Sequence, residues 1–273
     1  MGCFKGICNI THRKKRRNTL PPSKGKFAQL TSWSFSVYTR YRACAYEVCL
    51  DKIQRIRIEE LDNPHFVKGN RAHAIADTFI SGVGKKRPAL TEKVPFPGQK
   101  PIEVNLTSIK DQLADLRVKK ARTEQEWAFD RAWNAVDWRD WKNAWLRVKT
   151  DVCVDTVDPP TVEIVDWKTG KIHDEHRQQR SLYALGGLQL VQLGVLANGS
   201  KDTKLTAAHV YVDTGQTATE EFAFKKLPAL KREWLTRIDG MMKDTVYRPN
   251  PGRACYYCKF NQKRVGGPCK DGV

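Results

Sequence analysis

Three charged residues near the middle of the chain have the types and the spacing of a hydrolytic site. Asp166 and Lys168 are two positions apart in the run V-E-I-V-D-W-K, and strand geometry would place both side chains on one face. Asp151 belongs to the preceding run, L-R-V-K-T-D-V-C-V. Neighbouring carboxylates repel one another unless a cation lies between them, and oxygen ligands suit Mg²⁺ or Mn²⁺. The ordinary alternative for Asp166 and Lys168 is a solvated charge pair on a surface strand.

The elements that must position these residues follow from the hydrophobic pattern. Residues 146–154 alternate between apolar and polar side chains, which is typical of a half-buried strand. Pro159 and Pro160 interrupt this run, and a second apolar run begins at Val162, so we expect a hairpin. After Gly170 the chain changes to helical spacing, which predicts a helix over residues 175–193.

The complete pattern resembles the RecB-type exonuclease branch of the PD-(D/E)XK nuclease superfamily. The shared features are a first aspartate, the motif D-W-K-T-G-K, and Q-x-x-x-Y on the following helix, where Gln179 and Tyr183 lie four residues apart on one side. The resemblance implies metal-assisted hydrolysis of phosphodiester bonds, in which the metal lowers the pKa of a bound water. It implies catalytic roles for Asp151, Asp166, Lys168, Gln179 and Tyr183.

The resemblance also implies the ligands of the metal and the contacts to DNA. Asp151, Asp166 and the main-chain carbonyl of Trp167 would hold Mg²⁺ or Mn²⁺. His73, in the motif G-x-x-x-H, would complete or orient the site; on residue type alone, a lone histidine at the edge of a helix face is more often structural. Lys168 would position the attacking water, and Gln179 and Tyr183 would contact the DNA backbone or brace the site. Residues expected to hold DNA phosphates are Arg147 and Lys149.

Eight cysteines stand in a chain without an export signal, which favours thiols or metal ligands over disulfides. Cys255, Cys258 and Cys269 form C-x2-C-x10-C near the C-terminus. In iron–sulfur members of the RecB-type branch, three such cysteines join one on the first helix. Cys44 matches that position, with Cys49 as its rival. The resemblance implies a [4Fe–4S] cluster, and Zn²⁺ stays open because the x10 spacing exceeds the x5 common in the family.

The charge of the chain indicates a polyanionic partner. There are 48 Lys and Arg against 30 Asp and Glu in 273 residues, a net charge of +18. Residues 1–30, with the basic run His12–Arg17, are expected to form a flexible arm that contacts DNA non-specifically or is simply solvated. No apolar run reaches the roughly 20 residues that span a bilayer, so we expect a cytoplasmic protein without membrane contact. Cys3 and Cys8 receive no role.

Further elements are predicted more coarsely. A helix over 33–57 would be capped by Ser34 or Ser36. A second helix would begin at Gly69-Asn70, and Gly82 and Gly84 would end it. Glu126 is a candidate extra acid. Residues 85–115 yield no functional prediction. The remaining expected elements are a helix over 111–120, strands over 124–130 and 206–213, and a helix over 227–244 whose apolar side carries Leu230, Trp234, Ile238 and Met241.

Together these patterns predict an α/β fold with a restriction-endonuclease-like core. A short mixed sheet flanked by helices would fill residues 31–273, and a Cys-rich metal staple would occupy 247–273. The expected activity is that of a Mg²⁺-dependent deoxyribonuclease, an exonuclease in DNA recombination, repair or processing, of phage or mobile-element origin. A helicase or a single-strand-binding or annealing protein would be its partner. The alternative is a catalytically inactive nucleic-acid-binding or recombination scaffold protein with a structural zinc site.

Overall fold

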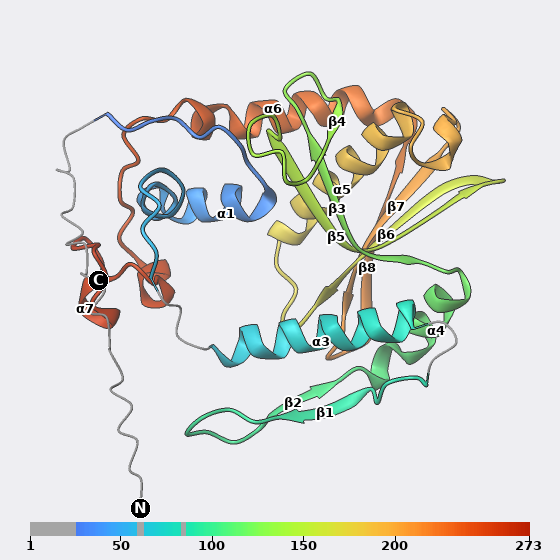
Figure 1. Cartoon of the computed structure of the whole chain (residues 1–273), viewed down its shortest axis with the longest axis horizontal. Coiled ribbons are helices and arrows are strands. Elements are labelled where there is room, and N and C mark those ends of the chain that lie inside the picture. Colours follow the sequence, from blue (N-terminus) through green and yellow to red (C-terminus); the bar gives the residue numbers. More distant parts are fainter. Residues whose placement is uncertain (1–25, 59–62, 83–85) are drawn as a thin grey trace, which may run out of the picture.

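The computed structural model describes residues 26–58, 63–82 and 86–273 (Figure 1). Most of the predicted basic arm, including the run His12–Arg17, therefore lies outside the described residues. Among the helices of the described ranges, none is both long and apolar enough to cross a bilayer.

A mixed six-stranded sheet is the centre of the fold. Its strand order is β4-β3-β5-β6-β7-β8, and all neighbours are antiparallel except β6 and β7, which are parallel. The predicted hairpin is confirmed, as are the strands on either side of it, while β8 was not predicted. The strands are β3 (Arg122–Phe129), β4 (Ala135–Val136), β5 (Leu146–Val157), β6 (Pro160–Lys168), β7 (Lys204–Tyr211) and β8 (Gln216–Ala223).

Each face of the sheet is covered by helices and has its own hydrophobic core. On one face, α5 (Glu175–Gln192) lies against the strands and α6 (Leu227–Lys243) packs outside it. On the other face, α3 (Pro64–Ser81) and α4 (Lys110–Val118) cover the strands. Successive residues of a strand point to opposite faces, so Ile164 enters the first core and Val165 the second. The predicted apolar side of α6 is buried, as expected, at Leu230, Trp234, Ile238 and Met241.

The first helical region is shorter than predicted because it breaks at Cys44. Ser34 caps α1 (Phe35–Ala43) by accepting a hydrogen bond from Val37 N–H. Cys44 then adopts an extended conformation, and the chain continues as α2 (Ala45–Val48) and a π-helical turn η1 (Cys49–Ile53). The prediction of a continuous helix over 33–57 was therefore wrong, because the spacing of apolar residues does not reveal a break of a single residue.

The start of α3 was also placed wrongly. Asn63 is its N-cap and accepts from His65 N–H, and Pro64 occupies the first helical position, where its missing N–H costs nothing. The pair Asn63-Pro64 thus begins the helix rather than separating two segments, and Gly69 lies in its second turn.

A small hairpin that was not among the predicted elements covers α3. It consists of β1 (Thr91–Val94) and β2 (Ile102–Asn105) and leads through the turn η2 (Thr107–Ile109) into α4. Val104 and Leu106 enter the core under α3. The connection after α5 contains η3 (Ala197–Gly199), and η4 (Phe224–Lys226) precedes α6.

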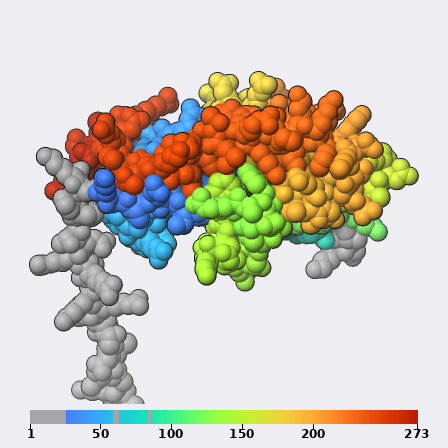
Figure 2. Space-filling model, turned by 90° about the horizontal axis from the view of Figure 1, so that it is seen from above, coloured from blue at the N-terminus to red at the C-terminus, as the bar shows by residue number. Residues whose placement is uncertain are grey.

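The C-terminal segment lies beside the first helix, far along the molecule from β8. It contains η5 (Arg253–Tyr257) and α7 (Gln262–Val265). Figure 2 shows α6, in orange, running along one face, with the red C-terminal segment and the blue first helix meeting at one end. The side chain of Asn250 donates to the carbonyl of Ala43 at 3.0 Å, which ties the C-terminal segment to the last residue of α1.

Candidate active site

The predicted carboxylates meet where β5 and β6 separate. Val152 and Val165 form the last bridged pair of this ladder. Beyond this pair, the Trp167 N–H donates to Oδ2 of Asp151 at 2.7 Å. The Asp151 side chain thus accepts the hydrogen bond that a main-chain carbonyl of the neighbouring strand would accept in a regular ladder. Asp166 and Asp151 are both buried, at 5% and 9% exposure. The hairpin therefore brings two carboxylates out of water and next to one another.

Lys168 lies beside Asp166, as their spacing predicted. Its Nζ is 2.5 Å from Oδ2 of Asp166. Burial alone would raise the pKa of the Asp166 carboxyl, but the charge of Lys168 and hydrogen bonds from Lys168 and Tyr183 outweigh it and lower the pKa. Asp166 is thus held as a carboxylate, the form that binds a cation.

Asp151 has the opposite tendency. Burial and the negative charge of Asp166 raise the pKa of Asp151, although His73 and the Trp167 N–H act against this shift. Two neighbouring buried carboxylates repel one another when both are ionised, and a divalent cation bound between them would remove this repulsion.

His73 joins the site from α3, the helix that runs beneath the strands in Figure 1. Its Nδ1 lies 3.2 Å from Oδ1 of Asp151 and its Nε2 lies 3.1 Å from the main-chain carbonyl of Trp167. Burial disfavours charge on the ring, but the hydrogen bond and charge of Asp151 outweigh burial and raise the pKa of His73. The histidine thus contacts the same two groups that were predicted as metal ligands.

Glu124 is a member of the site that the sequence did not reveal. Its carboxylate, the Asp151 carboxylate and the His73 ring offer ligand atoms that all lie within 4.8 Å of one another. Glu124 has a φ of 50°, a left-handed conformation unusual for a residue inside a strand. The predicted extra acid, Glu126, pairs instead with Lys149 in the β3–β5 ladder. Only the register of β3 against β5, which places position 124 across from Asp151, would have identified Glu124.

Gln179 and Tyr183 brace Asp166 from α5. Gln179 Nε2 donates to the Tyr183 hydroxyl at 2.6 Å, and that hydroxyl donates in turn to Oδ1 of Asp166. Burial and the charges of Asp166 and Asp151 raise the pKa of Tyr183, so its hydroxyl remains a proton donor. The motif Q-x-x-x-Y therefore orients the carboxylate from behind.

A second unpredicted residue, His209 on β7, approaches Asp166 from its other side. His209 is fully buried, and its Nε2 lies 3.8 Å from Oδ2 of Asp166. Arg180 lies on the far side of the ring, with a guanidinium nitrogen 3.2 Å from Nδ1. Since arginine only donates, Nδ1 accepts and the ring proton resides on Nε2, which faces the carboxylate.

The two residues predicted to hold DNA phosphates have protein partners. Lys149 Nζ lies 2.5 Å from Oε2 of Glu124. The guanidinium of Arg147 donates to the carbonyls of Trp138, Ala144 and Asp140 and lies 4.5 Å from the ring centre of Trp141. These contacts shape the loop between β4 and β5; DNA binding by Arg147 and Lys149 stays a prediction.

The cysteines do not form the predicted compact metal staple. Asn250 N–H donates to Sγ of Cys44 at 3.5 Å, so the C-terminal segment does reach the first helix. Across residues 26–58, 63–82 and 86–273, however, no trio containing Cys255, Cys258 or Cys269 has its ligand atoms within 4.8 Å of one another. The rival Cys49 is fully buried. The geometry therefore supports neither the zinc nor the iron–sulfur assignment.

The donor set around Asp151 suits a hard divalent cation. Carboxylate and carbonyl oxygens outnumber the single imidazole of His73, and oxygen donors are the ligands that suit Mg²⁺ or Mn²⁺. Oδ2 of Asp166 is buried, and apart from the Lys168 ammonium at 2.5 Å it has no hydrogen-bond donor among the described groups. Residues that would hold such an ion are Asp151, Asp166, His73, Glu124 and the carbonyl of Trp167.

Comparison with known proteins agrees with this chemistry. No curated protein matches the chain. Among solved structures, one described as "Crystal structure of SSO0001" aligns over 85% of each chain with 13% sequence identity and a TM-score of 0.33, a likeness too distant to carry an argument. The sequence profile of the PD-(D/E)XK nuclease superfamily matches residues 32–262 and so spans every residue of the site described above. The chain belongs to the PD-(D/E)XK nuclease superfamily.

Proposed function

We propose that this protein is a metal-dependent DNA exonuclease that acts in DNA recombination, repair or processing. The observation that carries the proposal is the pair of buried carboxylates, Asp151 and Asp166, with Lys168 at 2.5 Å from the second. An intact set of this kind disfavours the alternative of an inactive scaffold protein. Exonuclease rather than endonuclease action rests on the resemblance of His73, Gln179 and Tyr183 to the RecB-type motif.

Each side chain has a distinct task in the proposed reaction. When bound, Mg²⁺ or Mn²⁺ would polarise the scissile phosphate and lower the pKa of a coordinated water. Asp166 and Asp151 supply negative charge for the ion, and Tyr183 fixes the orientation of Asp166 through its hydroxyl. Lys168 donates toward the attacking water or the phosphate oxygens and offsets the charge that develops there.

Cleavage of end-labelled linear and of circular DNA tests the proposal. The purified chain should shorten linear DNA from its ends with Mg²⁺, should spare circles, and should do neither in EDTA. Asp166→Asn and Lys168→Gln should each lower the cleavage rate by about a hundredfold or more, with DNA binding retained. Cleavage of circular DNA would show that the protein is an endonuclease and not an exonuclease. Unchanged cleavage by Asp166→Asn would show that Asp166 does not belong to the active site.

Metal binding can be measured apart from cleavage. A ligand that binds only the folded state stabilises it by about 2.7 kcal/mol at a hundredfold excess over its Kd. Mn²⁺ should therefore raise the unfolding midpoint of the wild-type chain. Glu124→Gln should reduce this increase, whereas Glu126→Gln, two positions away, should leave it unchanged. Equal behaviour of the two variants would exclude Glu124 from the metal site.

A [4Fe–4S] cluster on Cys44, Cys255, Cys258 and Cys269 is a separate proposal. It is supported by the resemblance in sequence and by the hydrogen bond from Asn250 to Cys44, and not by the spacing of the sulfurs. Protein purified without oxygen should be brown and carry about four irons per chain. A colourless protein with one zinc per chain would favour a structural zinc site. A metal-free protein would mean that the cysteines hold no metal and that the C-terminal segment is attached to the first helix only by contacts such as that of Asn250 with Cys44.

A further inference from the structure

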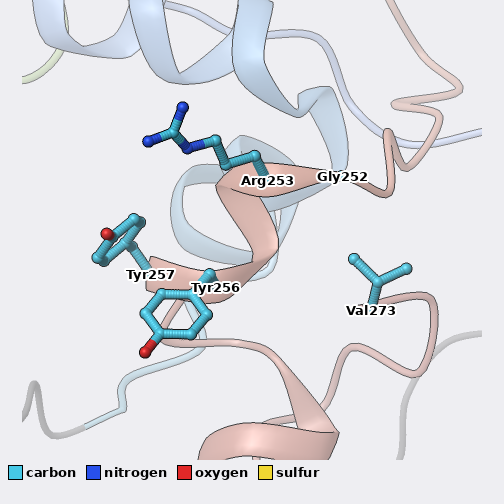
Figure 3. A pocket seen from close by; sticks show the side chains of 5 residues that line it. All are labelled: Gly252, Arg253, Tyr256, Tyr257 and Val273. Carbon is cyan, nitrogen blue, oxygen red and sulfur yellow. The ribbon is translucent and has the colours of Figure 1, made fainter.

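A shallow hollow on the C-terminal segment is lined by side chains that the proposed reaction does not use. It has a volume of about 570 Å³ and lies at Gly252, Arg253, Tyr256, Tyr257 and Val273. Figure 3 shows that Arg253, Tyr256 and Tyr257 project from one helical turn, η5, with Val273 apart from them on the last stretch of chain. In Figure 1 this segment is at one end of the molecule, beside α1 and away from the sheet.

Two large aromatic rings are displayed to solvent here. Tyr256 is 58% and Tyr257 is 72% exposed, and their ring centres are 4.9 Å apart in an edge-to-face arrangement. The guanidinium of Arg264 lies 3.4 Å from the ring centre of Tyr256 and so backs one ring with positive charge. Neighbouring rings of this kind contribute little to the core, and flat exposed rings are the surfaces on which unpaired bases stack.

The turn that carries the rings is held in place from below. Asn261 is 1% exposed, and its side-chain amide donates to the carbonyl of Cys255 at 3.0 Å and to that of Val273 at 3.2 Å. Its backbone N–H donates to the carbonyl of Cys258 at 3.1 Å. One buried side chain therefore fixes both walls of the hollow, so that little ordering is needed when a ligand binds.

The charge around the hollow selects an anionic ligand. The segment 247–273 contains six basic residues (Arg248, Arg253, Lys259, Lys263, Arg264 and Lys270) and a single acid, Asp271. Arg253 has no acidic partner within 4.0 Å among the residues that the structure describes. A basic surface with exposed rings is complementary to a phosphate backbone with accessible bases.

We propose that this hollow binds a single-stranded stretch of DNA. One or two bases would stack on Tyr257 and Tyr256, and Arg253 would hold an adjoining phosphate. The proposal rests on the proposed function, because it assigns to the nuclease a second grip on its substrate, separate from the carboxylate site. Duplex DNA would bind here weakly, since its bases are already stacked on one another.

Binding of a labelled dT15 oligonucleotide to the full-length chain in EDTA tests this site without cleavage. Tyr257→Ala should weaken binding about fivefold or more, since stacking one base is worth that factor or greater. Tyr257→Phe keeps the ring and should bind like wild type. Arg253→Gln should make the slope of log K against log salt shallower by about 0.7, the value for one single-strand phosphate, whereas Tyr257→Ala should leave this slope unchanged.

The outcomes separate this proposal from the proposed function. If Tyr257→Ala and Arg253→Gln both bind dT15 as the wild type does, the hollow is not a DNA site, and a protein partner would be the explanation for its rings. If Tyr257→Ala weakens duplex binding equally, stacking is wrong. Equal unfolding midpoints for Tyr257→Ala and Tyr257→Phe would show that the fold is intact. Absence of cleavage with Mg²⁺ would overturn only the nuclease activity, because these affinities are measured without metal.

Discussion

His209 is fully buried and cannot touch a substrate, but its ring faces the carboxylate of Asp166. Its ring lies between Arg180 on one side and Asp166 on the other. Burial lowers the pKa of His209 to about 3, the charge of Lys168 acts in the same direction, and Asp166 acts against it. The ring therefore stays neutral in the folded protein and keeps its proton directed at the carboxylate.

This neutral state predicts a loss of stability in mild acid. An unfolded histidine has a pKa of about 6.5, so between pH 6.5 and about 3 the unfolded chain binds a proton that native His209 does not bind. The free energy of unfolding should fall as the pH falls through this window. The contribution of His209 reaches up to about 2 kcal/mol between pH 6.5 and pH 5. Urea unfolding in EDTA at several pH values measures it.

His209→Gln should remove this contribution, so its free energy of unfolding should vary less steeply with pH than that of the wild type. His65, an exposed histidine in the first turn of α3, supplies the matched control. His65→Gln should follow the wild-type curve. If the His209 variant also follows it, the buried ring is protonated in the folded state.

The site residues divide into those that local sequence predicts and those that only the assembled sheet reveals. Asp166 and Lys168 were predictable because a period of two fixes their common face, and Gln179 and Tyr183 because a helix fixes theirs. Glu124 and His209 are brought to the site by pairing between strands that are distant in sequence. No local period encodes a register, so neither residue could be found from spacing.

At the level of elements, the contact of α5 with the sheet sets the position of the brace on Asp166. Two glycines, Gly186 and Gly187, let the helix backbone approach the strands closely. A Cβ on Gly187 would lie 2.5 Å from Cδ1 of Leu205 and 3.1 Å from Cδ1 of Ile164. The side chains of Leu205 and Ile164 are both fully buried, so they have little room to move away from such a Cβ.

We therefore expect Gly187→Val to destabilise the protein by roughly 1–3 kcal/mol, the usual cost of overpacking a core. The same substitution at Gly240 in α6, where a Cβ would meet nothing within 4 Å, is the control. Gly240→Val should be neutral or slightly stabilising, because glycine is the poorer helix former. Denaturant unfolding of both variants measures the difference, and equal effects would mean that α5 can shift away from the sheet.

Among the elements, those with a clear period and ordinary ends were predicted well. The β5–β6 hairpin, α5 and α6 were expected within a few residues of their bounds. The extended residue at Cys44 that divides the first helix was not expected, since R-A-C-A-Y continues a helical pattern. The β1–β2 hairpin was not expected either, because its short strands are half exposed and their stability comes from packing on α3.

At the scale of the whole molecule, the net charge of +18 should dominate the affinity for DNA. Log K for duplex DNA should fall linearly with log salt at a slope of about −0.9 per phosphate neutralised. Removal of residues 1–17, which hold six basic residues and no acid, should make the slope shallower. Filter binding or fluorescence anisotropy at several salt concentrations measures it.

A chain lacking residues 1–17 should still cleave DNA at low salt, because none of the carboxylate site lies in the deleted stretch. An unchanged slope would mean that the arm is solvated and that the charges of the folded part alone hold the duplex. A slope near zero in the full-length protein would contradict the electrostatic account altogether.

The backbone of Glu124 has a consequence for the history of the family. A left-handed residue other than glycine costs roughly 1–2 kcal/mol, and Glu124 carries this cost at φ 50°, between the pairs Thr123–Val152 and Gln125–Thr150 of the β3–β5 ladder. Glycine or asparagine would occupy the same backbone with less strain. Under the proposed metal-dependent function, a lineage that had lost its cation would be free to drift to one of these residues and become more stable. The residue found at this position in a relative would then record whether that lineage retains the proposed ion site.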